Sequence, residues 1–249
     1  MDAQTLHIDF IVPQGWHELT DAQLRYVYNL IALEMSSEEI AVTCMLHWSG
    51  TRVIGRQPDG AYLLQQGKTL FDVKPLAIAQ LAGEIRWLAE LPQVPVRISS
   101  LRGKPALAAD FQGVPFETFI ICDNLYQGYL QTQQDAMLDE LAAVLYPGIK
   151  KVSMPERISI FYWFASFKDY FSHRFSDFFQ PVAGADSNLL GAPNIGTQLQ
   201  EAMDAQIRAL TKGDITKEAE ILALDTWRAL TELNAQAREY KQLQAQMKK

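Results

Sequence analysis

The spacing of apolar residues predicts a mostly helical chain with one small region of strands. Residues 6–12 (LHIDFIV) alternate between apolar and polar positions and end at Pro13, which is typical of a β-strand. Apolar residues then recur every three or four positions over residues 20–35 and 36–50, so we expect a helical hairpin. Each of the two helices opens with a capping-box pair: Thr20 with Gln23, and Ser36 with Glu39.

Residues 52–73 change to short runs that favour β-structure. Pro58-Asp59-Gly60 and Gln66-Gly67-Lys68 separate these runs and predict tight turns. We therefore expect a meander of about three strands that forms a small antiparallel sheet with residues 6–12. Together with the helices, this sheet predicts an α+β fold that is predominantly helical.

Helical spacing returns over residues 74–91 and ends at Pro92. The following segment, up to Pro115, is rich in Pro and Gly, and it predicts loops with a short strand at residues 96–99 and a turn at residues 102–104. Two more helices are expected after this loop region: residues 116–131 and 134–146.

An aromatic helix is predicted at residues 155–179, with Pro155 near its first turn. The sequence from Ile158 to Phe179 holds ten aromatic residues in twenty-two. Such a surface could form buried core, a docking face for another protein, or a helix on a membrane surface. Apolar residues spread around much of the helix, and this favours burial between layers. Tyr and Trp also favour protein interfaces, which keeps docking open.

Residues 181–196 (PVAGADSNLLGAPNIG) lack periodicity and predict a linker. The linker would separate a mixed α+β body, residues 1–180, from a helical C-terminal region, residues 197–249. An apolar stripe in that region must pack on the chain itself or on another chain, because a lone helix cannot bury it. The candidate partner-binding residues on this stripe are Leu224, Trp227, Leu230, Leu233 and Tyr240.

Charge and composition argue against several classes of partner. The net charge is −7 and no dense Lys/Arg run occurs, so nucleic acid is not an expected partner. The longest apolar run in the aromatic segment is residues 158–167, which is too short to span a membrane. The first residues show no secretory signal and only two cysteines occur, so we expect a cytoplasmic protein with reduced thiols.

Residues with chemical potential are scattered. Cys44 and His47 are the nearest approach to a metal pattern, and two residues fall short of the three or four ligands that zinc requires. A thiol nucleophile would need a His from elsewhere in the chain, and nothing in the sequence selects one. Asp110 and Asp123 lie in apolar contexts, where a helix or turn cap is the simpler role. We therefore predict no catalytic residue, no metal and no cofactor, and no enzyme activity.

Two segments carry a resemblance to a known family. The opening IVPQGWHELTDAQLRYVYNL and the later AYLLQQGKTLFDV, followed by a helix ending in RWLAEL, resemble phage tail-assembly chaperones. The C-terminal half resembles uncharacterised proteins of prophage-like elements. This resemblance implies a non-enzymatic assembly factor that binds apolar segments of a tail protein, and it implies no particular functional residue. A homo-oligomeric structural component is the alternative, and an enzyme of unknown type is a third.

Overall fold

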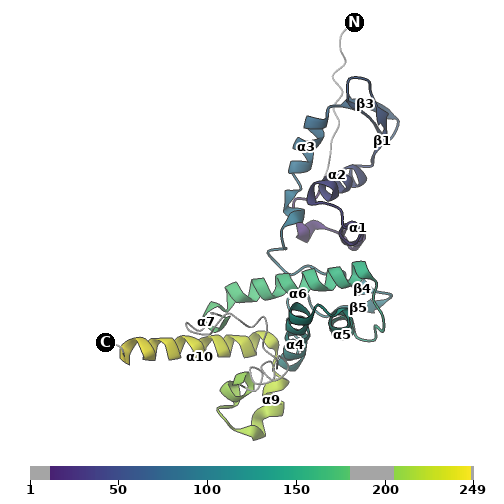
Figure 1. Cartoon of the computed structure of the whole chain (residues 1–249). Helices are drawn as coiled ribbons and strands as arrows, with labels where there is room; N and C mark the ends of the chain where they lie inside the picture. The colour runs from purple at the N-terminus through teal and green to yellow at the C-terminus, as the bar shows by residue number, and fades with distance from the viewer. Residues whose placement is uncertain (1–11, 180–204, 248–249) are drawn as a thin grey trace. The chain divides into compact units, whose positions relative to one another are not determined.

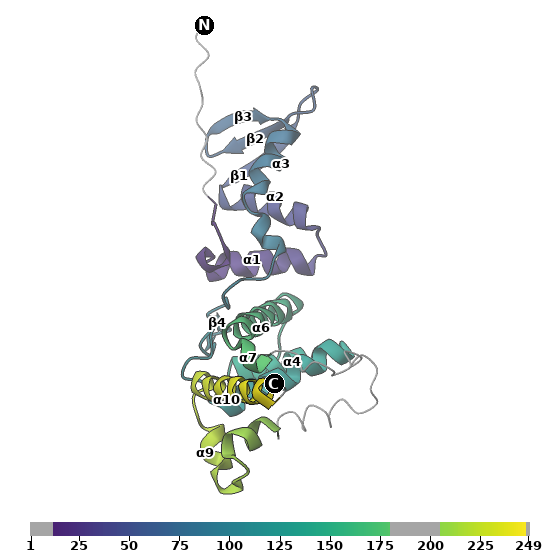
Figure 2. The same ribbon diagram turned by 90° about the vertical axis from the view of Figure 1, so that its left-hand side faces the viewer.

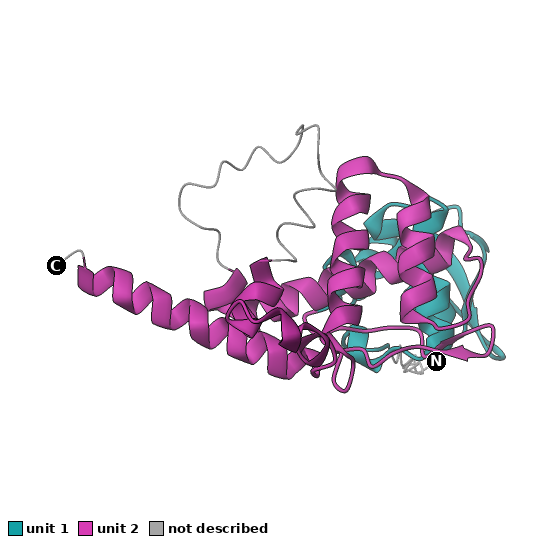
Figure 3. Ribbon diagram, turned by 90° about the horizontal axis from the view of Figure 1, so that it is seen from below, with its two compact units in different colours: residues 1–92 teal, residues 93–249 magenta. Residues whose placement is uncertain are grey.

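The computed structural model describes residues 12–179 and 205–247, which form an α+β fold that is predominantly helical, as predicted. The chain divides into two compact units, Met1–Pro92 and Gln93–Lys249, shown in two colours in Figure 3. Pro92 ends a helical segment and opens the Pro- and Gly-rich loop region, but the sequence did not distinguish this loop region from a boundary between units. The linker predicted at residues 181–196 lies outside the described residues.

Unit 1 begins with a 3-10 turn, η1 (Trp16–Glu18), and two helices, α1 (Asp21–Ala32) and α2 (Ser37–Trp48). Both capping boxes are confirmed. In each of them the hydroxyl-bearing residue before the helix accepts a hydrogen bond from the third helical N–H, and the third side chain accepts one in return. These pairs account for both helix starts.

The predicted three-stranded meander is also confirmed. β1 (Thr51–Arg56), β2 (Tyr62–Gln66) and β3 (Thr69–Val73) pair antiparallel in the order β1-β2-β3. The fourth strand predicted at residues 6–12 lies outside the described residues except for Val12, which is not in a strand.

The single helix predicted over residues 74–91 is wrong. It divides into α3 (Pro75–Gly83) and the 3-10 helix η2 (Arg86–Ala89). Between them Ile85 leaves the helical backbone, at φ −116° and ψ 26°, and its side chain is fully buried. The chain therefore leaves the helix where the Ile85 side chain enters the core, although the helical spacing of apolar residues continues. Helix α2 packs against β1, α3 and η2, and this holds unit 1 together (Figure 2).

Unit 2 opens with a hairpin of two short strands, β4 (Ser100–Leu101) and β5 (Lys104–Pro105). The strand predicted at residues 96–99 is wrong, whereas the turn predicted at residues 102–104 is confirmed. Arg102 and Gly103 both have positive φ, 48° and 74°, and this left-handed backbone turns the chain. The predicted helix pair follows as α4 (Phe116–Thr132) and α5 (Asp135–Leu145).

The aromatic segment forms α6 (Met154–Arg174) and a short α7 (Ser176–Phe179), which lie in the same unit as α4 and α5 (Figure 1). The helix predicted over residues 155–179 is thus interrupted at Phe175, whose backbone has φ −115° and ψ 51°. Half of the ten aromatic side chains are buried in the core, as the first interpretation held, and the other five are half-buried. The fully buried ones on α6 are Trp163, Phe164, Phe167 and Phe171.

After a helical stretch at residues 205–211, the chain forms η3 (Ile215–Lys217), α9 (Glu218–Leu222) and α10 (Thr226–Met247). The predicted apolar stripe of the C-terminal region therefore does not lie on one helix, because Leu224 precedes α10. The break occurs because the main chain at Leu224 and Thr226 bonds instead to residues at and just before the start of α4. Phe116 N–H donates to Leu224 O at 2.7 Å, and Thr226 N–H donates to Val114 O at 2.9 Å.

Candidate functional site

Neither cysteine is placed for nucleophilic chemistry. Cys44 on α2 and Cys122 on α4 are both fully buried and unbonded to each other. Burial disfavours the thiolate, which raises the pKa of Cys44 to about 12 and raises the pKa of Cys122 as well. Both side chains therefore act as small apolar core groups at neutral pH.

The Cys44–His47 spacing does not assemble a metal site. His47 stacks on Tyr26, with ring centroids 3.9 Å apart, while Cys44 faces the core. Within residues 12–179 and 205–247, no cluster of three or more His, Cys, Asp or Glu side chains could hold a metal ion.

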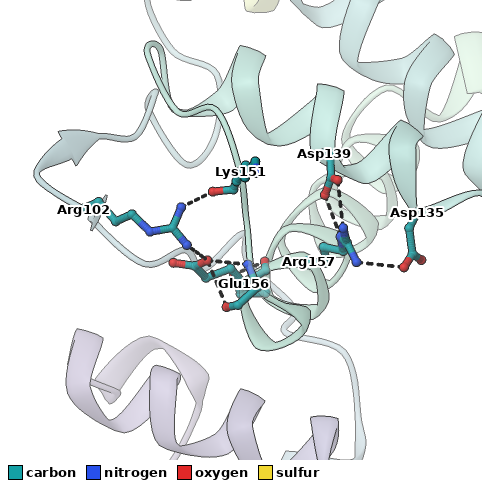
Figure 4. Close-up of polar contacts among 8 residues, drawn as sticks. Arg102, Asp135, Asp139, Lys151, Glu156 and Arg157 are labelled. Carbon is teal, nitrogen blue, oxygen red and sulfur yellow. Dashed lines mark hydrogen bonds and ion pairs between the residues drawn. The ribbon is translucent and has the colours of Figure 1, made fainter.

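A group of charged side chains surrounds the first turn of α6, and five of them have a partner of opposite sign: Arg102, Asp135, Asp139, Glu156 and Arg157 (Figure 4). Arg157 donates through Nε and Nη2 to Asp139, at 2.6 and 2.8 Å, and through Nη1 to Asp135 at 2.8 Å. Glu156 accepts from Arg102 Nη2 at 2.7 Å. These ion pairs link α6 to α5 through Arg157 and to the β4–β5 hairpin through Glu156.

The two acidic residues in apolar contexts have different roles. Asp110 accepts from Gln112 N–H at 3.1 Å, which is the turn cap expected for it. The cap predicted for Asp123 is wrong, because this residue lies within α4 and pairs with Lys168 of α6 at 2.7 Å. The Lys168 ammonium also lies 4.9 Å from the centroid of the Phe179 ring, a cation–π contact.

The first half of α10 packs on its own unit. Leu230 and Leu233 are 0% and 3% exposed, and Leu224, just before the helix, is half-buried. Trp227 packs edge-on against Phe171 and Phe175, with centroids 5.1 and 5.8 Å apart. Intramolecular packing, the alternative open for this stripe, therefore applies to four of the five candidate residues.

Two indoles hold the loop that precedes α4. Trp163 Nε1 of α6 donates to Ala109 O at 2.8 Å, and Trp227 Nε1 of α10 donates to Asp110 O at 2.7 Å. The next residue, Phe111, has φ of 60° and is fully buried against Phe167. A buried residue with left-handed backbone persists only where its surroundings impose it, and the two indoles do so here.

In the second half of α10, two basic side chains bond to α7. Asp177 of α7 accepts from Arg238 Nε at 2.9 Å and lies 3.3 Å from Lys241 Nζ. These hydrogen bonds, that from Arg238 first, lower the pKa of the Asp177 carboxyl below its ordinary value. Beyond this clamp α10 continues past the other described helices of its unit (Figures 1 and 3).

The exposed end of α10 keeps its apolar stripe. Tyr240, Leu243 and Met247 are 62%, 59% and 81% exposed, and they fall near the face that Leu233 occupies about two to four turns earlier. We call these three residues the distal stripe. Tyr240 was the one candidate from the sequence to remain exposed. Leu243 and Met247 belong to the same predicted stripe but were not among its candidate residues, although their position in the polar run KQLQAQM marks them as apolar residues out of context.

No helix within the described residues combines the length and the apolar character that crossing a lipid bilayer requires. Comparison of the chain with protein-family models, with curated proteins and with solved structures finds no match.

Proposed function

We propose that this chain is a non-enzymatic, cytoplasmic interaction protein that acts in the assembly of a phage-type particle, and that it binds an apolar segment of a partner protein through the distal stripe. One observation carries the proposal. The same helical face that is buried at Leu230 and Leu233 emerges with large apolar side chains at Tyr240, Leu243 and Met247. The tail-assembly role itself comes from the resemblance of the N-terminal segments to that family.

Exposing the distal stripe to water is unfavourable unless another apolar surface covers it. Residues around it are Gln, Lys and Ala, so Tyr, Leu and Met at helical spacing form a narrow apolar strip on a polar helix. A helix of this kind docks into an apolar groove through side chains at i, i+3 and i+7, which is the spacing of residues 240, 243 and 247. The clamp at Asp177 holds the preceding turn in place, so the strip is presented on an ordered helix.

The test is co-purification with the products of neighbouring genes, co-expressed one at a time with the full chain. Leu243→Glu places a charge in the distal stripe and should abolish recovery of the partner. The matched control is Ala245→Glu, which adds the same charge on the opposite face of α10. Equal recovery with both variants, or loss with both, would remove the distal stripe as the docking face.

A further inference from the structure

A groove runs along unit 1 between α2 and α3. One hollow of about 470 Å³ lies between the first turns of α2 and the end of α3, and a second of about 330 Å³ lies between α2, α3 and the sheet. The two hollows share Val42 and Ala79, so they are parts of one groove. Its walls are mostly small or aliphatic: Ala41, Val42, Leu46, Ala79, Ala82 and Gly83.

The shape of the groove suits a helix. Ala and Gly in its lining let another backbone approach closely. At 1.5 Å per residue, α3 is about 13 Å long, and the distal stripe from Tyr240 to Met247 spans about 10 Å. The chain therefore carries one concave apolar surface and one convex apolar strip of matching length.

Charge also matches between the two surfaces. Residues 1–92 contain eleven acidic and six basic residues, and Glu38 and Glu90 line the groove beside Arg86. Residues 236–249 contain four basic residues and one acidic residue. An apolar strip flanked by basic side chains is attracted to an apolar groove with an acidic rim.

We infer that the groove of unit 1 receives the distal stripe of a second copy of this chain. The inference rests on the proposed function, because it uses the same docking strip and gives that strip a second receptor. The contact joins two different surfaces, so repeating it links copies head to tail into a ring or a filament. Self-association of this kind would supply the homo-oligomeric role that the sequence left open.

Two substitutions block the two sides separately. Ala79→Lys places a positive charge in the groove, at an exposed position shared by both hollows, and this charge repels the basic residues beside the strip. Its control is Gln80→Lys, one residue away and outside the lining. Leu243→Glu blocks the strip, with Ala245→Glu as control. By light scattering over a concentration series, each blocking variant should weaken self-association by about tenfold or more, because each buries an unpaired charge, and each control should match wild type.

Mixing the two blocked variants gives the decisive result. The Ala79→Lys chain keeps its strip and the Leu243→Glu chain keeps its groove, so the mixture should form one-to-one pairs and nothing larger. Ala89→Lys and Met247→Glu repeat the experiment if either first variant is misfolded by circular dichroism. A wild-type chain that stays monomeric, an Ala79→Lys chain that associates normally, or a mixture without pairs overturns the inference. The proposed function would still stand if Leu243→Glu alone lost the foreign partner.

Discussion

Helix α10 offers two leucines that differ in burial and in little else. Leu230 is 0% exposed and Leu243 is 59% exposed, and both lie within one continuous helix. Replacing each by Ala removes the same atoms, so the difference between the two variants measures packing alone. We predict a large loss of stability for Leu230→Ala and almost none for Leu243→Ala.

The expected magnitude follows from burial. Removing three buried carbons costs about 2.4 kcal/mol at about 0.8 kcal/mol each. The cavity left at Leu230 raises the cost to about 3–5 kcal/mol, because its surroundings collapse only in part. At Leu243 most of the side chain is already in water, so the free energy of unfolding should change by less than about 0.5 kcal/mol.

Urea unfolding followed by tryptophan fluorescence measures this difference, since Trp163 and Trp227 are packed in the core of unit 2. With a slope of about 3 kcal/mol per molar urea, the Leu230→Ala midpoint should fall by about 1 M or more. Similar midpoints for the two variants would refute the packing of α10 described above. A loss of partner binding by Leu230→Ala would report unfolding, so it cannot serve to test docking.

Three further predictions concern charge, backbone and thiols. The folded pKa of Asp177 lies below its ordinary 3.8, so its stabilisation of α10 is present above that pH and is lost as the pH falls. Amide protection factors in the distal turns, which correct for the intrinsic pH dependence of exchange, should therefore fall on acidification in wild type and stay constant in Asp177→Asn. Glu34 has φ of 56°, so Glu34→Gly should raise the free energy of unfolding by about 0.5–1 kcal/mol, whereas Glu38→Gly in the first turn of α2 should lower it, as thermal unfolding would show. Cys44 and Cys122 should react with a thiol reagent only after denaturation, and fast reaction of either in the native protein would contradict its burial.

Local signals in the sequence predicted the local structure. Thr20 and Ser36 cap helices because their partners lie three residues away, and the turns of the β-meander depend on adjacent residues. The break before α10 depends on Val114 and Phe116, more than a hundred positions earlier, and no local pattern records it. Local helical spacing therefore could not show this break, because the contacts that cause it come from a distant part of the chain.

The candidate site was predictable only in part. The apolar spacing that marked Leu230 and Leu233 is the same as that of Tyr240, and only the structure shows that the covering layer ends between them. The groove gave a weaker signal, a run of small residues at helical spacing on α3: Ala79, Ala82 and Gly83. This run becomes informative once α2 is known to lie beside α3.

The hydrogen bonds from Thr226 and Trp227 to the loop before α4 also affect how fast unit 2 can fold. Trp227 Nε1 and Asp110 O are 117 positions apart in the chain, and Thr226 Oγ1 and Val114 O are 112 apart. Bringing such distant segments together costs loop-closure entropy before any of these bonds forms, and topologies with many long-range contacts fold slowly. In unit 1, Trp16 Nε1 donates to Trp87 O and Glu90 O, which are 71 and 74 positions away. Unit 1 therefore closes shorter loops than unit 2 and should reach its native state first.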